Sequence, residues 1–188
     1  VCMLHTKRDL RDALQRKAKS LDTTIRSLAT YHRVRSERLA LARENPVAFC
    51  EFVMRNETTQ RLIYHCAPHQ KVALMHAWEN KRSVQIRPIN HSKTFDATAL
   101  ALFMIGKFPN KRGFITGRVE KQAKKILSNV GRYIKHSPEF REVFPHVIPG
   151  EKWTDSEIIV KRDPGMKDPT CAAFGLDSHG KLGFRADW

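Results

Sequence analysis

The sequence predicts an α/β fold, a mostly parallel sheet flanked by helices, preceded by an N-terminal helical arm. Two patterns predict this class. From residue 45 onward, short strand-like runs alternate with longer runs of helical periodicity, which is typical of parallel strands joined by helices. Before residue 45, one apolar seam continues without a break, which predicts a single long helix. We therefore divide the chain into an arm, residues 1–44, and a domain, residues 45–188.

The arm has the spacing of a basic amphipathic helix from about Thr6 to Arg43. Lysines and arginines lie between apolar or small residues that recur at intervals of four and three. Such a helix packs on a partner or follows nucleic acid, or it docks on its own domain; the sequence leaves these alternatives open. The seam consists of Leu10, Leu14, Ala18, Leu21, Ile25, Leu28 and His32.

Five further helices are expected in the domain. Proline suits the first turn of a helix, so Pro46 and Pro68 mark two starts, and Ser137 caps a third helix that begins at Pro138. The other two helices follow from apolar residues at helical spacing. The predicted helices cover residues 46–55, 67–78, 93–108, 119–134 and 137–144.

Four strands are expected between and after these helices. Each is a short run rich in β-branched or other apolar residues and bounded by turn residues. The last two are joined by the turn Asp163-Pro164-Gly165. The predicted strands cover residues 83–86, 112–116, 157–162 and 170–176.

Composition favours a globular protein with a polyanionic partner. Hydrophobic residues make up 41% of the 188 residues, enough to bury a core. The formal net charge is +15, which makes nucleic acid the first partner to consider, although an ordinary basic solvated surface is the alternative. No apolar run reaches the length of a membrane span and no signal peptide is visible, so we expect a soluble, intracellular protein. Val1 and Trp188 lead us to expect that both ends are cuts in a longer chain.

A candidate phosphate-binding loop lies at residues 83–94. A strand-like run is followed by the loop 87–92, by Lys93-Thr94 and by an apolar helix. Backbone N–H groups at such a helix start point at an anion, the lysine neutralises phosphates, and the hydroxyl ligates Mg²⁺. The usual pattern is G-x-x-x-x-G-K-[ST], and here Arg87 and Ser92 replace both glycines. The alternative is a buried helix entered through a polar loop, with Lys93 exposed and Asp96 as partner of the helix dipole.

Eight stretches carry a resemblance to a known family. They lie at residues 45–49, 67–70, 87–94, 120–127, 138–145, 152–154, 168–170 and 183–187. Together, and in this order, they resemble the large terminase subunit of tailed bacteriophages, the ATPase that drives DNA into the capsid. The resemblance covers residues 45–188 and implies a P-loop NTPase-like fold; no motif covers the arm.

The resemblance implies roles for individual residues. Lys93 is similar to the phosphate-binding lysine of the Walker A loop, and Thr94 to the hydroxyl that ligates Mg²⁺. Gln70 stands where the family reads adenine. Arg185, ahead of the expected next strand, is implied to approach the nucleotide or to couple it to DNA.

The loop departs from the family's usual Pro-Arg-Gly-His-Gly-Lys. Asn90 and Ser92 stand at its two glycines, on either side of His91, and Ile89 stands at its arginine. Arg87 is close by, and we take it as a candidate replacement for the lost charge.

The resemblance also implies cofactors and partners. ATP and Mg²⁺ are the expected cofactors. Double-stranded DNA, the portal of the procapsid and the small terminase subunit are the expected partners of a homo-oligomeric ring in the host cytoplasm, with no membrane involved. The Walker B acidic pair and a nuclease domain are expected after Trp188, so we expect residues 1–188 alone to bind nucleotide weakly and to hydrolyse it negligibly.

Two other functions remain open. One is another nucleic-acid-dependent ATPase of related fold, such as a helicase. The other is a non-catalytic module that binds DNA or a capsid protein, in which the phosphate loop has decayed.

Overall fold

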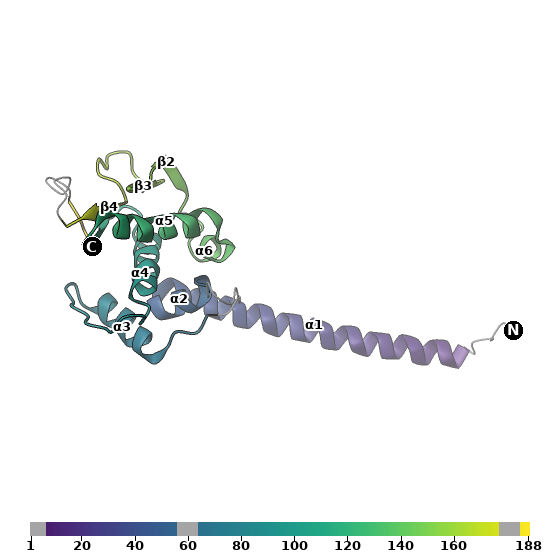
Figure 1. The fold of residues 1–188 in the computed structure, drawn as a ribbon. Helices are drawn as coiled ribbons and strands as arrows, with labels where there is room; N and C mark the ends of the chain where they lie inside the picture. The colour runs from purple at the N-terminus through teal and green to yellow at the C-terminus, as the bar shows by residue number, and fades with distance from the viewer. Residues whose placement is uncertain (1–6, 56–63, 177–184) are drawn as a thin grey trace. The chain divides into compact units, whose positions relative to one another are not determined.

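The computed structural model describes residues 7–55, 64–176 and 185–188, and it is an α/β structure with a long N-terminal helix (Figure 1). By its internal contacts the chain divides into two compact units, residues 1–38 and residues 39–188. The first unit ends inside the stretch predicted as the arm. We describe each unit by itself.

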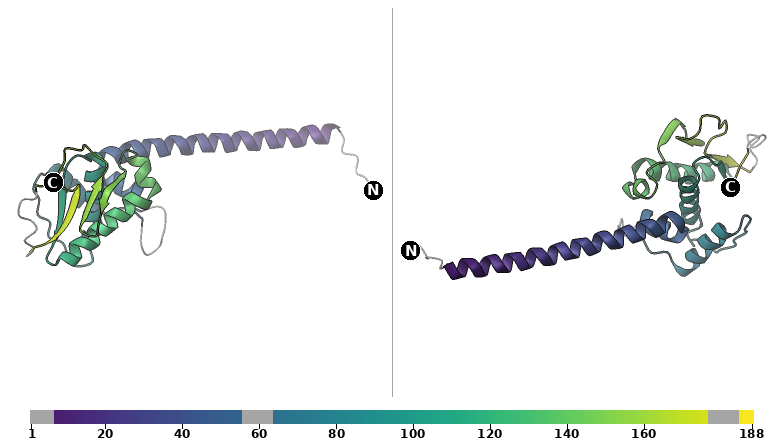
Figure 2. Two further views of the ribbon diagram at one scale, coloured as in Figure 1. Left: turned by 90° about the horizontal axis from the view of Figure 1, so that it is seen from above. Right: turned by 180° about the vertical axis from the view of Figure 1, so that it is seen from behind.

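Helix α1 (Lys7–Glu44) supplies the first unit and continues into the second (Figure 2). It matches the long helix predicted from the seam. Within the first unit the part of the seam whose side chains are described is open to solvent, since Leu21, Ile25 and Leu28 are more than half exposed. The described polar contacts here are local, such as the ion pair of Asp22 with Arg26 at 3.0 Å, one turn apart. Helix propensity and local pairs therefore hold this helix.

The second unit contains the five helices that the sequence predicts. They are α2 (Pro46–Val53), α3 (Pro68–Glu79), α4 (Lys93–Lys107), α5 (Glu120–His136) and α6 (Pro138–Val143). Side chains cap two of them. The Asn45 side-chain oxygen accepts from the backbone N–H groups of Val47 and Ala48, and the Ser137 hydroxyl accepts from that of Phe140.

The sheet is mixed, which corrects the predicted mostly parallel sheet. Its order is β1 (Gly113–Gly117), β4 (Cys171–Gly175), β3 (Glu157–Val160) and β2 (Pro149–Trp153). Among the four strands that the described residues form, β1 and β4 pair in parallel and the other neighbours are antiparallel. The reason lies in the connections. A parallel pair needs a long crossover, and helix α5 lies between β1 and β4, whereas β2, β3 and β4 follow one another without a helix.

One predicted strand is absent from the described residues, and one observed strand was not predicted. Residues 83–86 form no strand in the part of the chain that the structure describes; Val84 and Ile86 are almost fully exposed, and the Gln85 amide donates instead to the Ala73 carbonyl of α3 at 2.8 Å. Strand β2 was missed, because its sequence begins with Pro149-Gly150 and was interpreted as a helix stop. Proline is tolerated there as the first residue of a strand.

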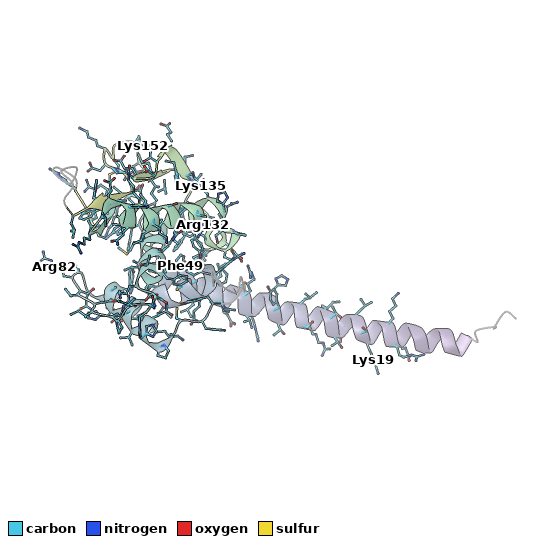
Figure 3. All side chains as sticks on the ribbon, viewed as in Figure 1. Lys19, Phe49, Arg82, Arg132, Lys135 and Lys152 are labelled. Atoms are coloured by element: carbon cyan, nitrogen blue, oxygen red, sulfur yellow. The ribbon has the colours of Figure 1, made fainter. Side chains whose placement is uncertain are left out.

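An aromatic core forms where α2, α4 and α6 meet. The ring of Phe49 lies 5.4 Å from that of Phe103, 6.2 Å from Phe140 and 5.6 Å from Phe144, and all four side chains are buried. Figure 3 shows Phe49 enclosed by other side chains. Gly106 belongs to the same packing, because a β-carbon there would meet the Phe144 ring at 2.1 Å. Helix α5 packs on β1 and β4 and also contacts α4.

Candidate functional site

The loop before α4 has an unusual backbone. Asn90 has φ 65° and Ser92 has φ 54°, the two positive φ angles at non-glycine residues in the described part of the chain. These are the two positions at which the resembled family has glycine. Glycine adopts this left-handed region freely and asparagine tolerates it, whereas serine does so at a cost. The loop therefore has the backbone path of a glycine-containing loop without containing a glycine.

Helix α4 begins directly after this loop, at Lys93. Ser92 is its N-cap residue, and the Ser92 side chain makes no capping bond to the helix. Backbone N–H groups of the first turn are thus left to other partners, and they point toward the loop side of the helix.

The ammonium group of Lys93 lies over its own loop. It donates to the carbonyl oxygens of Arg87 at 2.8 Å and of Pro88 at 2.6 Å. The lysine side chain is exposed, as is Thr94 beside it. Lys93 is therefore positioned at the loop by backbone acceptors rather than by a carboxylate.

A cavity of about 570 Å³ opens beside the loop. Asn90, His91, Ser92, Lys93 and Thr94 are among its lining residues. Lys125, Asn129 and Tyr133 of α5 also line it, and Met54 and Phe95 add apolar surface. Its volume falls in the range of small-molecule sites. Five of the predicted site residues thus share one cavity.

Gln70, predicted to read adenine, is buried behind α4 and has both ends of its amide engaged. Its nitrogen donates to Asp96 Oδ1 at 2.6 Å. Its oxygen accepts from the Tyr64 hydroxyl at 2.7 Å and from the Ala67 N–H at 3.1 Å. Burial raises the pKa of Tyr64 to about 12, although the bond to Gln70 opposes the shift. In this geometry the glutamine amide has no exposed edge.

Arg87 is likewise turned inward. Its guanidinium pairs with Asp96 Oδ2, and both side chains are largely buried. Arg87 Nε is buried without a hydrogen-bond partner. One carboxylate, Asp96, therefore ties together Gln70 of α3, Arg87 of the segment before the loop, and α4 itself.

Two predicted residues lie at the margin of the site or away from it. His91 is exposed, and its ring centroid is 5.3 Å from that of His69 on α3. Arg185 is exposed and does not line the cavity. Two residues further on, the Asp187 carboxylate binds Arg112 ahead of β1, and hydrogen bonds from the Arg112 side chain and backbone hold the pKa of Asp187 below its usual value.

The residues that sequence reasoning missed are on α5. Lys125, Asn129 and Tyr133 are spaced by four, so they share one face of the helix. Lys125 was placed off the apolar stripe, but its neighbours along that face were not recognised as a set. The four-residue spacing could have shown that these side chains share one face of α5. The sequence does not show that this face lies at the same cavity as the loop before α4.

The described residues contain no group of three or more His, Cys, Asp or Glu side chains able to hold a metal ion. Among the helices of residues 7–55, 64–176 and 185–188, none is both long enough and apolar enough to cross a membrane. Comparison of the chain with protein-family models, with curated proteins and with solved structures finds no match.

Proposed function

We propose that this chain is the ATP-binding part of a P-loop motor that packages viral DNA, a terminase large subunit. One observation supports the proposal above the others. Asn90 and Ser92 both have a positive φ, a region that glycine adopts freely, and Lys93 and Thr94, which follow them, line a cavity whose volume falls in the range of small-molecule sites. A decayed loop would have no reason to keep two left-handed residues ahead of a lysine.

The residues of the loop have distinct tasks in this proposal. The first-turn N–H groups of α4 and the Lys93 ammonium bind the phosphates of ATP. The Thr94 hydroxyl, which lines the cavity, would be the protein ligand of a Mg²⁺ ion bound with the nucleotide. Such an ion would supply positive charge next to the phosphates.

Gln70 and Arg87 act behind the site in this proposal. Both bind Asp96, in the first turn of α4, so they fix the helix start against α3. We assign both residues to positioning of the loop. This replaces the adenine contact that the resemblance implies for Gln70, and the substitution for the lost charge for which Arg87 was a candidate.

Duplex DNA is the proposed polyanionic partner. The net charge of +15 supports contact with the phosphate backbone without sequence readout. Hydrolysis of ATP would be coupled to movement of DNA through a portal into a procapsid by a ring of subunits.

Titration of Mg-ATP into the chain tests the proposal. Binding is the decisive measurement, because no carboxylate that would activate water lines the described part of the cavity. We expect Lys93→Ala to weaken ATP binding by about tenfold or more, because the variant loses a charge-assisted contact to the phosphates. Lys121→Ala is the matched control, an exposed lysine on α5 that does not line the cavity, and should bind like the unaltered chain.

Equal affinity of Lys93→Ala and the unaltered chain would remove Lys93 from the site. Absence of ATP binding together with salt-sensitive DNA binding would favour the non-catalytic DNA-binding module instead.

A further inference from the structure

The face of α5 that lines the cavity is the feature that the proposed function leaves unused. Lys125, Asn129 and Tyr133 face the cavity at intervals of one helical turn. Tyr133 is held in place, since its hydroxyl accepts from the Arg55 N–H at 3.3 Å. The face is therefore a defined wall rather than a set of loose side chains.

Lys125 differs from the lysine next to it. Lys124 is engaged with Glu120 at 2.9 Å and with Asp155 at 3.1 Å. Within the described part of the chain, Lys125 has neither a carboxylate at ion-pair distance nor a hydrogen bond. Its positive charge is thus uncompensated by described groups, and it lines the cavity.

The cavity as a whole has one sign of charge. Its described lining includes two lysines, Lys93 and Lys125, and one histidine, His91, and no aspartate or glutamate. The lysines come from two different elements, Lys93 from the start of α4 after the loop and Lys125 from α5. Two cations and a helix start around one space suit a ligand with several adjacent negative charges better than one with a single charge.

We infer that Lys125 is a second phosphate-binding residue, which contacts the outer phosphates of a bound nucleoside triphosphate from α5. The inference rests on the proposed function and adds to it a basis for selecting triphosphate over monophosphate. Asn129 and Tyr133 form the uncharged part of the α5 face that lines the cavity, and Lys125 supplies the positive charge of that face.

Binding of ATP and of AMP to matched variants tests this. We expect Lys125→Met to weaken ATP binding by about tenfold and AMP binding by less than about threefold, because the lost contact is charge-assisted and falls on the outer phosphates. Lys125→Arg should keep ATP affinity within about threefold, since the charge remains. Lys124→Met, one residue away, should leave both affinities unchanged. Thermal unfolding of each variant checks the fold.

The outcomes separate this inference from the proposed function. Loss of ATP affinity in Lys93→Ala, with Lys125→Met equal to the unaltered chain, overturns the role of Lys125 and leaves the ATP site standing. Equal losses for ATP and AMP in Lys125→Met also overturn it, because a structural role would not distinguish the ligands. Absence of ATP binding by the unaltered chain overturns both.

Discussion

The aromatic core and the loop at residues 87–92 both adjoin α4, and different forces stabilise them. Around Phe103 the helix is buried among rings, and side-chain volume decides the packing. At Lys93 the same helix begins in solvent, and hydrogen bonds and one ion pair decide the geometry. Removing a ring from the core would leave a void. Removing the Asp96 carboxylate would instead take away the hydrogen bond and the ion pair that fix the segment around the loop.

The difference assigns stability mainly to the core and the candidate site to the loop. Apolar burial in the core supplies free energy of folding that does not depend on the loop's conformation. The loop instead contains two left-handed residues, which cost free energy that the rest of the domain must supply. Mutations in the two regions should therefore have separable effects.

The largest effect is expected from Phe49→Ala, which tests the core. The side chain is fully buried against three other rings, so its removal should lower the free energy of unfolding by about 3–5 kcal/mol. Urea denaturation of the variant measures it. Phe114→Ala is the control, because Phe114 is 40% exposed and should cost far less. Similar costs for the two variants would show that the aromatic cluster does not dominate the core.

The next effect is expected from Asp96→Ala, which tests the loop. The variant leaves Arg87 largely buried without its carboxylate and Gln70 without an acceptor, so we expect a loss of about 2–3 kcal/mol in the free energy of unfolding. The pair Arg87→Met with Asp96→Leu replaces both charges by apolar groups and should recover the part of that loss that comes from the unpaired guanidinium, while Gln70 stays without its acceptor. A double variant no more stable than Asp96→Ala would mean that the ion pair is not the source of the cost.

The smallest effect is expected from Ser92→Gly. This variant tests whether the backbone of the loop is strained at this position, unlike the core. Glycine accepts the φ of 54° without strain, so the free energy of unfolding should rise by about 1 kcal/mol. Asn90→Gly should gain less, because asparagine tolerates this region. Ser128→Gly, at an exposed position inside α5, should instead lose about 1 kcal/mol. If Ser92→Gly is destabilising, the left-handed conformation is not what the serine adopts in solution.

The helices were predictable because their signals are local. Apolar spacing located α4 and α5, and Asn45 and Ser137 with the prolines after them marked two helix starts that the structure confirms as caps. The mixed sheet was not predicted, since strand direction depends on partners far apart in the chain. Residues 83–86 alternate like a strand, but a strand exists only where a neighbour binds its backbone, and the described residues supply none.

The residues that line the cavity could be predicted in part. Lys93 and Thr94 were recognisable from their place between a loop and an apolar helix, and they do line the cavity. The bonds of Gln70 and Arg87 to Asp96 were not predictable, because each joins residues whose side chains meet only after α3 and α4 pack. The α5 wall was missed for the same reason.

The two hydrogen bonds that Lys93 makes to the loop carbonyls have a consequence for anion selectivity. An anion that draws the ammonium toward the cavity must first replace two acceptors at 2.8 and 2.6 Å. A singly charged ion such as chloride offers too little in exchange, whereas a chain of phosphates offers several oxygens at once. In the proposed site, the carbonyl oxygens of Arg87 and Pro88 would compete with any bound anion for the Lys93 ammonium, so phosphates would be favoured over anions that offer a single acceptor.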